Sequence, residues 1–181
     1  MSRTDYEREH NYDKLRAAIH YVCEHNNDVG GTLDDVKLNK VLWYADALTY
    51  MTRGQSITGT TYIRKPRGPV AQGHNKAIVG LIKDKCIRDG KAKQDGDWPK
   101  TFDSIKAADK TPFSKTDLAM FDRVYDYINS MSSRQISDQS HGNVWKLARD
   151  REEIPLYTVF AEGIGKVTEA DIKRATADLR G

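Results

Sequence analysis

Apolar residues recur at helical spacing near the start of the chain. One stretch is apolar at positions i, i+3, i+4 and i+7, which predicts a helix over about 12–25 with one buried face, formed by Leu15, Ala18, Ile19 and Val22. Asparagine and glycine residues between positions 26 and 31 predict the end of this helix.

A second helix is predicted to end near Gly54, with Arg53 in its last turn, because glycine favours the left-handed conformation that closes helices. Thr32 is the expected N-cap, and Asp35 follows three residues later, where a carboxylate favours the positive end of a helix. The buried face of this helix is a further apolar stripe, formed by Leu38, Val41, Leu42, Ala45 and Leu48.

Two aromatic residues of this second helix, Trp43 and Tyr44, are adjacent in the sequence. Adjacent helical positions point about a quarter turn or more apart, so both cannot face the centre of the core. Two interpretations stay open. Either one ring is in the core and the other lies at its rim, or one is an exposed aromatic anchor for a binding partner.

Residues 57–64, ITGTTYIR, are rich in β-branched and aromatic side chains and predict a short strand, with a turn at Gly59 before it as an open option. Lys65 and Gly68 each precede a proline, which moves both away from helical geometry. Pro69 then suits the first turn of a third helix over about 70–85.

Short, turn-rich signals predict a small hairpin with strands near 86–88 and 101–105. The next helix has a clear start, because Ser114 is a good N-cap and Asp117 stands three residues later, where it can complete a capping box. Phe113 before the cap is expected to pack on Leu118. The buried face of the helix continues through Phe121, Val124, Tyr125 and Ile128.

The C-terminal part of the chain predicts two further helices. The first covers about 133–151, with Gly142 as a dividing point, and ends before Pro155. The second begins at Thr168 and runs to about 179. Residues 156–160 fit either an extended segment or a buried turn.

These elements predict an α+β fold, a mainly helical single domain over 1–181 with a small antiparallel sheet or hairpin at one edge. Hydrophobic residues make up 38% of the chain and charged residues 30%, which is enough for a core beneath a very polar surface. No metal, disulfide or cofactor is expected to be needed, and Cys23 and Cys86 are expected to be free thiols in a reducing cytoplasm. The charged N-terminus has no secretory signal pattern, and no apolar run approaches the roughly 20 residues of a membrane helix.

Positive charge is concentrated in the middle of the chain. Residues 64–93 contain nine Lys and Arg against two acids, or +7, so the rest carries −4 of the overall +3. Such a segment suits an acidic protein surface or a nucleic acid. An ordinary solvated surface is the alternative.

Motifs of catalysis and metal binding are lacking in the sequence. It contains no nucleophile elbow, phosphate-binding loop, dinucleotide fingerprint or HExxH pattern. The acidic pairs at 34–35 and 152–153 are adjacent in sequence and so diverge on a helix. His141 and Trp145 stand four residues apart, which favours packing on one face over a metal site. The protein is therefore expected to bind rather than to catalyse.

Three pieces of sequence resemble the Panacea (SocA-like) antitoxin family when taken in order: the run KLNKVLWYA at 37–45, the corner Gly68-Pro69-Val70, and His141 with Trp145. The similarity covers about 12–150, with 151–181 as a C-terminal helical extension. Many relatives have an aromatic residue just before the Gly-Pro corner, where this chain has Arg67.

The resemblance implies a bacterial or phage-associated antitoxin without enzymatic activity, which neutralises a toxin encoded nearby by direct protein contact. We expect the contact patch to combine residues 57–69 with the exposed side of the helix over 33–53, and a contribution of the C-terminal helix stays open. Its expected contact residues are Tyr62, Arg64 and Arg67, with Tyr44 as a weaker candidate. Two alternatives stay open: a nucleic-acid-binding regulator that uses the basic 64–93 segment, and an adaptor that delivers its partner to a protease.

Overall fold

The computed structural model describes residues 3–90 and 100–159. Six α-helices lie in this part of the chain: α1 (Arg3–Asp28), α2 (Asp35–Arg53), α3 (His74–Lys83), α4 (Lys115–Asn129), α5 (Ser133–Gln139) and α6 (Asn143–Leu147). The strands are β1 (Tyr62–Lys65), β2 (Gly68–Ala71), β3 (Ile87–Asp89), β4 (Phe102–Ser104) and β5 (Glu153–Ile154), and the 3-10 helix η1 covers Leu156–Thr158. The predicted class, mainly helical α+β, is confirmed.

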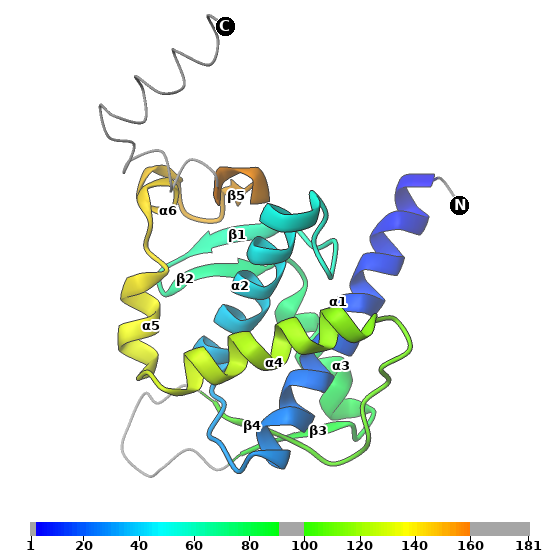
Figure 1. Cartoon of the computed structure of the whole chain (residues 1–181). Helices are drawn as coiled ribbons and strands as arrows, with labels where there is room; N and C mark the ends of the chain where they lie inside the picture. The colour runs from blue at the N-terminus through cyan, green and yellow to red at the C-terminus, as the bar shows by residue number, and fades with distance from the viewer. Residues whose placement is uncertain (1–2, 91–99, 160–181) are drawn as a thin grey trace, which may run out of the picture.

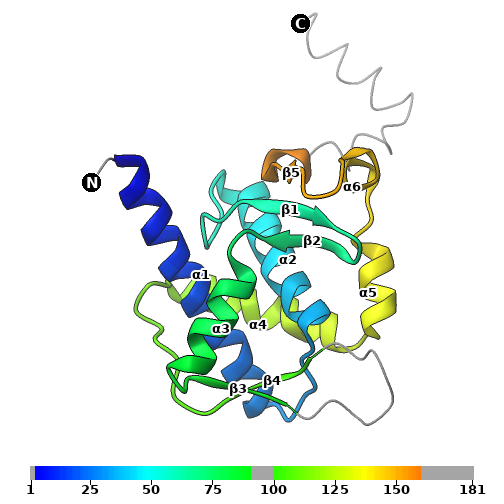
Figure 2. The same cartoon turned by 180° about the vertical axis from the view of Figure 1, so that it is seen from behind.

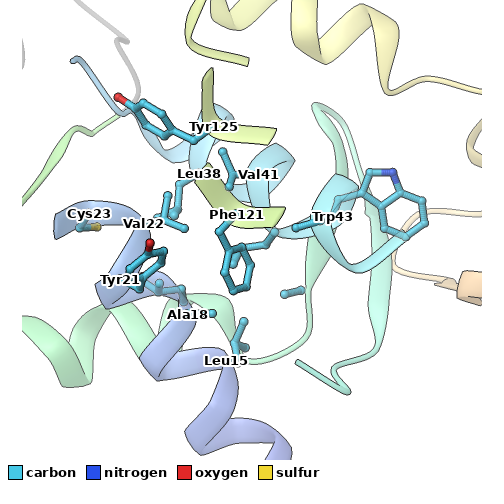
Figure 3. Packing of buried hydrophobic residues seen from close by; sticks show 14 of the residues in the cluster. Leu15, Ala18, Tyr21, Val22, Cys23, Leu38, Val41, Trp43, Phe121 and Tyr125 are labelled. Carbon is cyan, nitrogen blue, oxygen red and sulfur yellow. The ribbon is translucent and has the colours of Figure 1, made fainter. Parts of the chain in front are cut away.

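Helix α2 is the centre of the fold (Figure 1). It packs against α1, α4, α5, β2 and η1. Its predicted core positions Leu38, Val41, Leu42 and Ala45 are fully buried. Figure 3 shows Phe121 of α4 pointing into the space between the buried side chains of α1 and α2.

The ends of α2 show one correct and one wrong prediction. Gly54 closes the helix in the left-handed conformation, with φ of 70°, and its N–H donates to the carbonyl of Tyr50. Thr32 as the N-cap is wrong, because Asp34 caps the helix and its carboxylate accepts from the backbone N–H of Lys37 at 2.9 Å. Asp34 also accepts a hydrogen bond from Ser133 of α5, so the cap ties two helices together.

Strands β1 and β2 form an antiparallel hairpin, and β5 adds to the other side of β1. The strand predicted over 57–64 is confirmed only from Tyr62 onwards. Ile57 and Thr58 donate their backbone N–H groups to the carboxylate of Asp46 instead of to a neighbouring strand, and Gly59 turns the chain with φ of 68°.

The helix predicted from Pro69 is wrong in its start. Pro69 lies in β2, opposite Arg64, and α3 begins only at His74, after Gly73 with φ of 88°. A proline fits this position because β2 is an edge strand of its sheet, where a missing N–H breaks no ladder.

The hairpin predicted near 86–88 and 101–105 is confirmed as β3 paired with β4. Helix α4 begins with the predicted capping box of Ser114 and Asp117. Its four predicted core residues are all buried: Phe121, Val124, Tyr125 and Ile128.

The helix predicted over 133–151 is divided at the expected place. Helix α5 ends at Gln139 and α6 begins at Asn143, just after Gly142. The described part of segment 156–160, for which two conformations stayed open, forms the turn η1. The helix predicted from Thr168 lies outside the described residues. Cys23 is buried and Cys86 partly buried, and both are free thiols.

Candidate functional site

The β1–β2 hairpin is held against α6 by one tryptophan. The indole Nε1 of Trp145 donates to the carbonyl of Lys65 at 3.0 Å, and the guanidinium Nε of Arg64 donates to the carbonyl of Trp145 at 3.0 Å. The Arg64 guanidinium also lies 4.3 Å from the centre of the Trp145 ring. His141 stacks on the same indole, with ring centroids 3.6 Å apart. The prediction that His141 and Trp145 pack together is confirmed.

The other side of the hairpin rests on a buried lysine. Lys40 is 1% exposed, and its Nζ donates to the carbonyl of Pro69 at 3.3 Å. None of the ion pairs between described residues includes Lys40. Burial lowers the pKa of this amine to about 7.

Glycine is required where the hairpin meets Lys40. Gly68 has φ of 106°, and a Cβ there would lie 2.3 Å from the Ser140 hydroxyl and 2.4 Å from the Lys40 Nζ. Ser137 of α5 donates to the carbonyl of Arg67 at 3.2 Å, which fixes the hairpin turn as well. The Gly-Pro corner is therefore a close contact between backbone and side chains.

Basic side chains gather next to the Gly-Pro corner. Burial lowers the pKa of His141, and the charges of Lys40, Arg64 and Lys146 lower it further against an opposing effect of Asp138. The Nε2 atom of His141 is buried and has no hydrogen-bond partner among the described residues. We call Lys40, Arg64 and His141 the basic corner; at neutral pH its arginine is fully charged, whereas the lowered pKa values leave His141 neutral and Lys40 only partly charged.

An apolar groove with a volume of about 320 Å³ opens beside the basic corner. One wall is a second stripe of α2, which we call the outer stripe: Tyr44, Ala47, Leu48 and Met51. The other walls are Trp43, Pro69, Gln139, Ser140, Gly142, Trp145, Ile154, Thr158 and Val159. The groove thus lies between α2 and the elements β2, α5, α6, β5 and η1.

The structure places two of the four predicted contact residues, Tyr44 and Arg64, at or near this groove. Tyr44 lines it, and Arg64 lies on Trp145 at its edge. Arg67 is exposed in the turn between β1 and β2. Partner contact by these three residues stays a prediction.

Tyr62 needs a correction. Its side chain is 1% exposed, so it offers no surface to a partner. Its hydroxyl donates to the carboxylate of Asp46 at 2.8 Å, and its ring packs edge-on against Trp43 with centroids 4.9 Å apart. The side chains of a strand alternate between faces, and Tyr62 is on the face that packs on α2.

The structure supports the first interpretation of the two adjacent aromatic residues, in which one ring lies in the core and the other at its rim. Trp43 is buried in the core, and Tyr44 is half-buried at its rim and lines the groove. Leu48, predicted to be in the core, is instead 42% exposed, and Met51 is 48% exposed. This second stripe was not predicted, although its spacing of i, i+4 and i+7 from Tyr44 is visible in the sequence.

The basic segment 64–93 does not form one continuous surface in its described part. The hairpin carries Arg64 and Arg67 at one end of the fold, and β3 lies at the other end (Figure 2). There Arg88 pairs with Asp103 at 3.3 Å. The charge of this segment is therefore divided between separate faces.

Within residues 3–90 and 100–159, no group of three or more His, Cys, Asp or Glu side chains is placed to hold a metal ion. No helix in that part of the chain combines the length and apolar character needed to cross a membrane.

Comparison with known proteins identifies one family. The family model for the antitoxin SocA-like, Panacea domain matches residues 38–146, more than half of the chain. The matched range contains the outer stripe, the hairpin, Lys40, His141 and Trp145. No curated protein and no solved structure matches the chain significantly. The chain belongs to the antitoxin SocA-like, Panacea domain family.

Proposed function

We propose that this protein neutralises a toxin, encoded by a neighbouring gene, through direct protein contact and without making or breaking a covalent bond. Its membership of an antitoxin family supports the general role. The observation that carries the mode of action is the convergence of distant family residues on one hairpin. Lys40 and Trp145 hold its two strands, next to an open apolar groove.

A rigid hairpin favours binding for a physical reason. The Trp145 indole, the Ser137 hydroxyl and the Lys40 amine each donate to a different backbone carbonyl between residues 65 and 69. A segment held in this way loses little conformational entropy when a partner binds. The contact surface would be the hairpin turn together with the outer stripe of α2.

The test is co-expression of the protein with the product of the adjacent reading frame in a host that this product inhibits. The wild-type protein should restore growth. The double variant Arg64→Glu, Arg67→Glu should lose this effect, because charge reversal opposes an acidic partner surface. Arg123→Glu, an exposed arginine of α4, is the matched control and should restore growth like the wild type.

Each variant must first be shown to fold, by its far-ultraviolet circular dichroism and its unfolding midpoint. Full rescue by a folded double variant would remove the hairpin from the contact surface. A neighbouring product that is harmless, or that the wild type does not neutralise, would overturn the proposed function itself.

Two measurements separate this function from its competitors. An adaptor for a protease would shorten the lifetime of the partner in cells, whereas direct blockage leaves the amount of partner unchanged. A nucleic-acid-binding regulator would bind duplex DNA or RNA with an affinity that falls steeply as salt rises. The nucleic-acid-binding function has less support, because the basic residues are divided between separate faces.

A further inference from the structure

We propose that the apolar groove beside α6 is the binding site for a short segment of the toxin, and that this segment presents an apolar side chain next to a carboxylate. This inference rests on the proposed function and names the part of the partner that the site recognises. It goes beyond the hairpin turn, because the groove is lined by the outer stripe of α2 and by residues of α5, α6, β5 and η1, and Arg67 is not among its lining residues.

The apolar part of this binding site is the outer stripe of α2. Leu48 and Met51 are 42% and 48% exposed, although their helix is the most central of the fold. The core of the protein is already formed by the neighbouring stripe, of Leu38, Val41 and Leu42. Side chains that the core does not use, gathered in a concave surface, are typical of a binding site.

The size of the groove limits its occupant. A volume of about 320 Å³ lies at the lower end of the range for ligand pockets. It has room for a few side chains and not for a whole domain. One helical turn or one extended segment of a partner, with an apolar anchor, fits this space.

The charge beside the groove indicates what accompanies the anchor. Arg64, whose Nε donates to the Trp145 carbonyl, is in no ion pair between described residues. Its remaining guanidinium N–H groups suit a two-point contact with a carboxylate. Arg64 and Lys146 both act as positive charges on His141, and Asp138 is the carboxylate that opposes them. A carboxylate from the partner would supply the missing counter-charge.

A protein segment suits this combination better than a nucleic acid. Phosphate backbones are bound by rows of exposed cations. Here Arg64 is half-buried on Trp145, Lys40 is 1% exposed, and the adjoining wall is apolar. The same chemistry gives duplex DNA as the competing outcome of the test.

The affinity of the full-length protein for the product of the adjacent reading frame is measured by calorimetry. The variant Leu48→Asp, Met51→Asp should weaken binding at least about 30-fold, the size of a central hot-spot loss. Val79→Asp is the matched control, because Val79 is 66% exposed on α3, away from the groove. It should bind within about threefold of the wild type, as expected for a residue outside the interface.

The contribution of the Arg64 guanidinium to toxin binding is tested with Arg64→Ala and Arg64→Lys. Arg64→Ala should weaken binding about tenfold or more and flatten its dependence on salt. Arg64→Lys keeps the charge and should recover much of the salt dependence but not the two-point contact. Circular dichroism and unfolding midpoints accompany every variant.

The outcomes are distinct. Folded groove variants that bind the toxin as tightly as the wild type overturn this inference and leave the proposed function intact. A wild type that binds no toxin overturns the proposed function, and the inference with it. Displacement of the toxin by a 20-base-pair DNA duplex, abolished by Arg64→Ala, would assign the corner to phosphate and would also overturn the inference.

Discussion

The amine of Lys40 donates a hydrogen bond to the carbonyl of Pro69 over 3.3 Å, inside the contact between α2 and the β1–β2 hairpin. These residues belong to two family motifs that are 29 positions apart in the chain. A lysine this deeply buried is costly when charged. Its presence at the contact therefore makes the stability of the protein depend on pH.

The first prediction concerns this pH dependence. Burial lowers the pKa of Lys40 from 10.5 to about 7, so between these values the unfolded chain holds a proton that the folded protein lacks. The free energy of unfolding should therefore rise with pH from 7 to about 10, with a limiting slope of about 1.4 kcal/mol per pH unit for one proton. Below pH 7 both states are charged, and this contribution to the slope vanishes.

Lys40→Met isolates the effect, because other groups also titrate in this range. The difference in unfolding free energy between wild type and variant, measured in urea at each pH, should grow in favour of the wild type as pH rises. Lys37→Met, on the partly exposed side of the same helix, controls for the loss of one charge. A difference that stays constant from pH 7 to 10 would contradict the prediction.

The second prediction concerns Gly68. A Cβ at this position needs both a left-handed backbone and space that the Ser140 hydroxyl and the Lys40 amine already occupy. Gly68→Ala should lower the free energy of unfolding by about 3 kcal/mol, the sum of a backbone cost and a packing cost.

Gly54→Ala is its matched control. Gly54 also has a positive φ, of 70°, but a Cβ added there would have no neighbouring atom within 4 Å. It should cost only about 1 kcal/mol, the backbone part alone. Equal losses in the two variants would show that the corner can relax around a methyl group.

Local sequence signals predicted the elements whose ends depend on one residue. Gly54 closes α2, and the Ser114 capping box opens α4, because each acts through backbone atoms no more than four residues away. Local sequence signals failed where a group distant in the sequence competes for backbone hydrogen bonds. Asp46 takes the N–H groups of Ile57 and Thr58, so the strand begins late.

The candidate site depends even more on distant contacts. Trp145 and Lys65 are 80 positions apart, and no local pattern shows that an indole will hold this hairpin. The order of the family motifs identified the segments that form the site but not the contacts between them. The exposed Leu48 looked like a core residue because its spacing fits two stripes of the same helix at once.

The third prediction tests the corrected start of α2. Asp34 accepts from the Lys37 N–H and from the Ser133 hydroxyl, so Asp34→Ala should cost about 2 kcal/mol, the upper value for an N-cap. Thr32→Ala, at the exposed position that the sequence pattern favoured as the cap, should change stability by less than about 0.5 kcal/mol. Urea unfolding of both variants decides between the two caps, and a larger loss for Thr32→Ala would assign the cap to Thr32.

The last prediction separates support of the site from contact with the partner. The buried carboxylate of Asp46 accepts from the hydroxyls of Thr58 and Tyr62 besides two backbone N–H groups. Tyr62→Phe removes one of these four donors and should cost about 1–2 kcal/mol, with toxin neutralisation unchanged. Asp46→Asn replaces one of the two acceptor oxygens by an amide NH₂ group that faces other donors. This change should cost about 3 kcal/mol or more. If Tyr62→Phe instead folds with wild-type stability but no longer neutralises the toxin, the hydroxyl acts on the partner and the burial of Tyr62 is not its role.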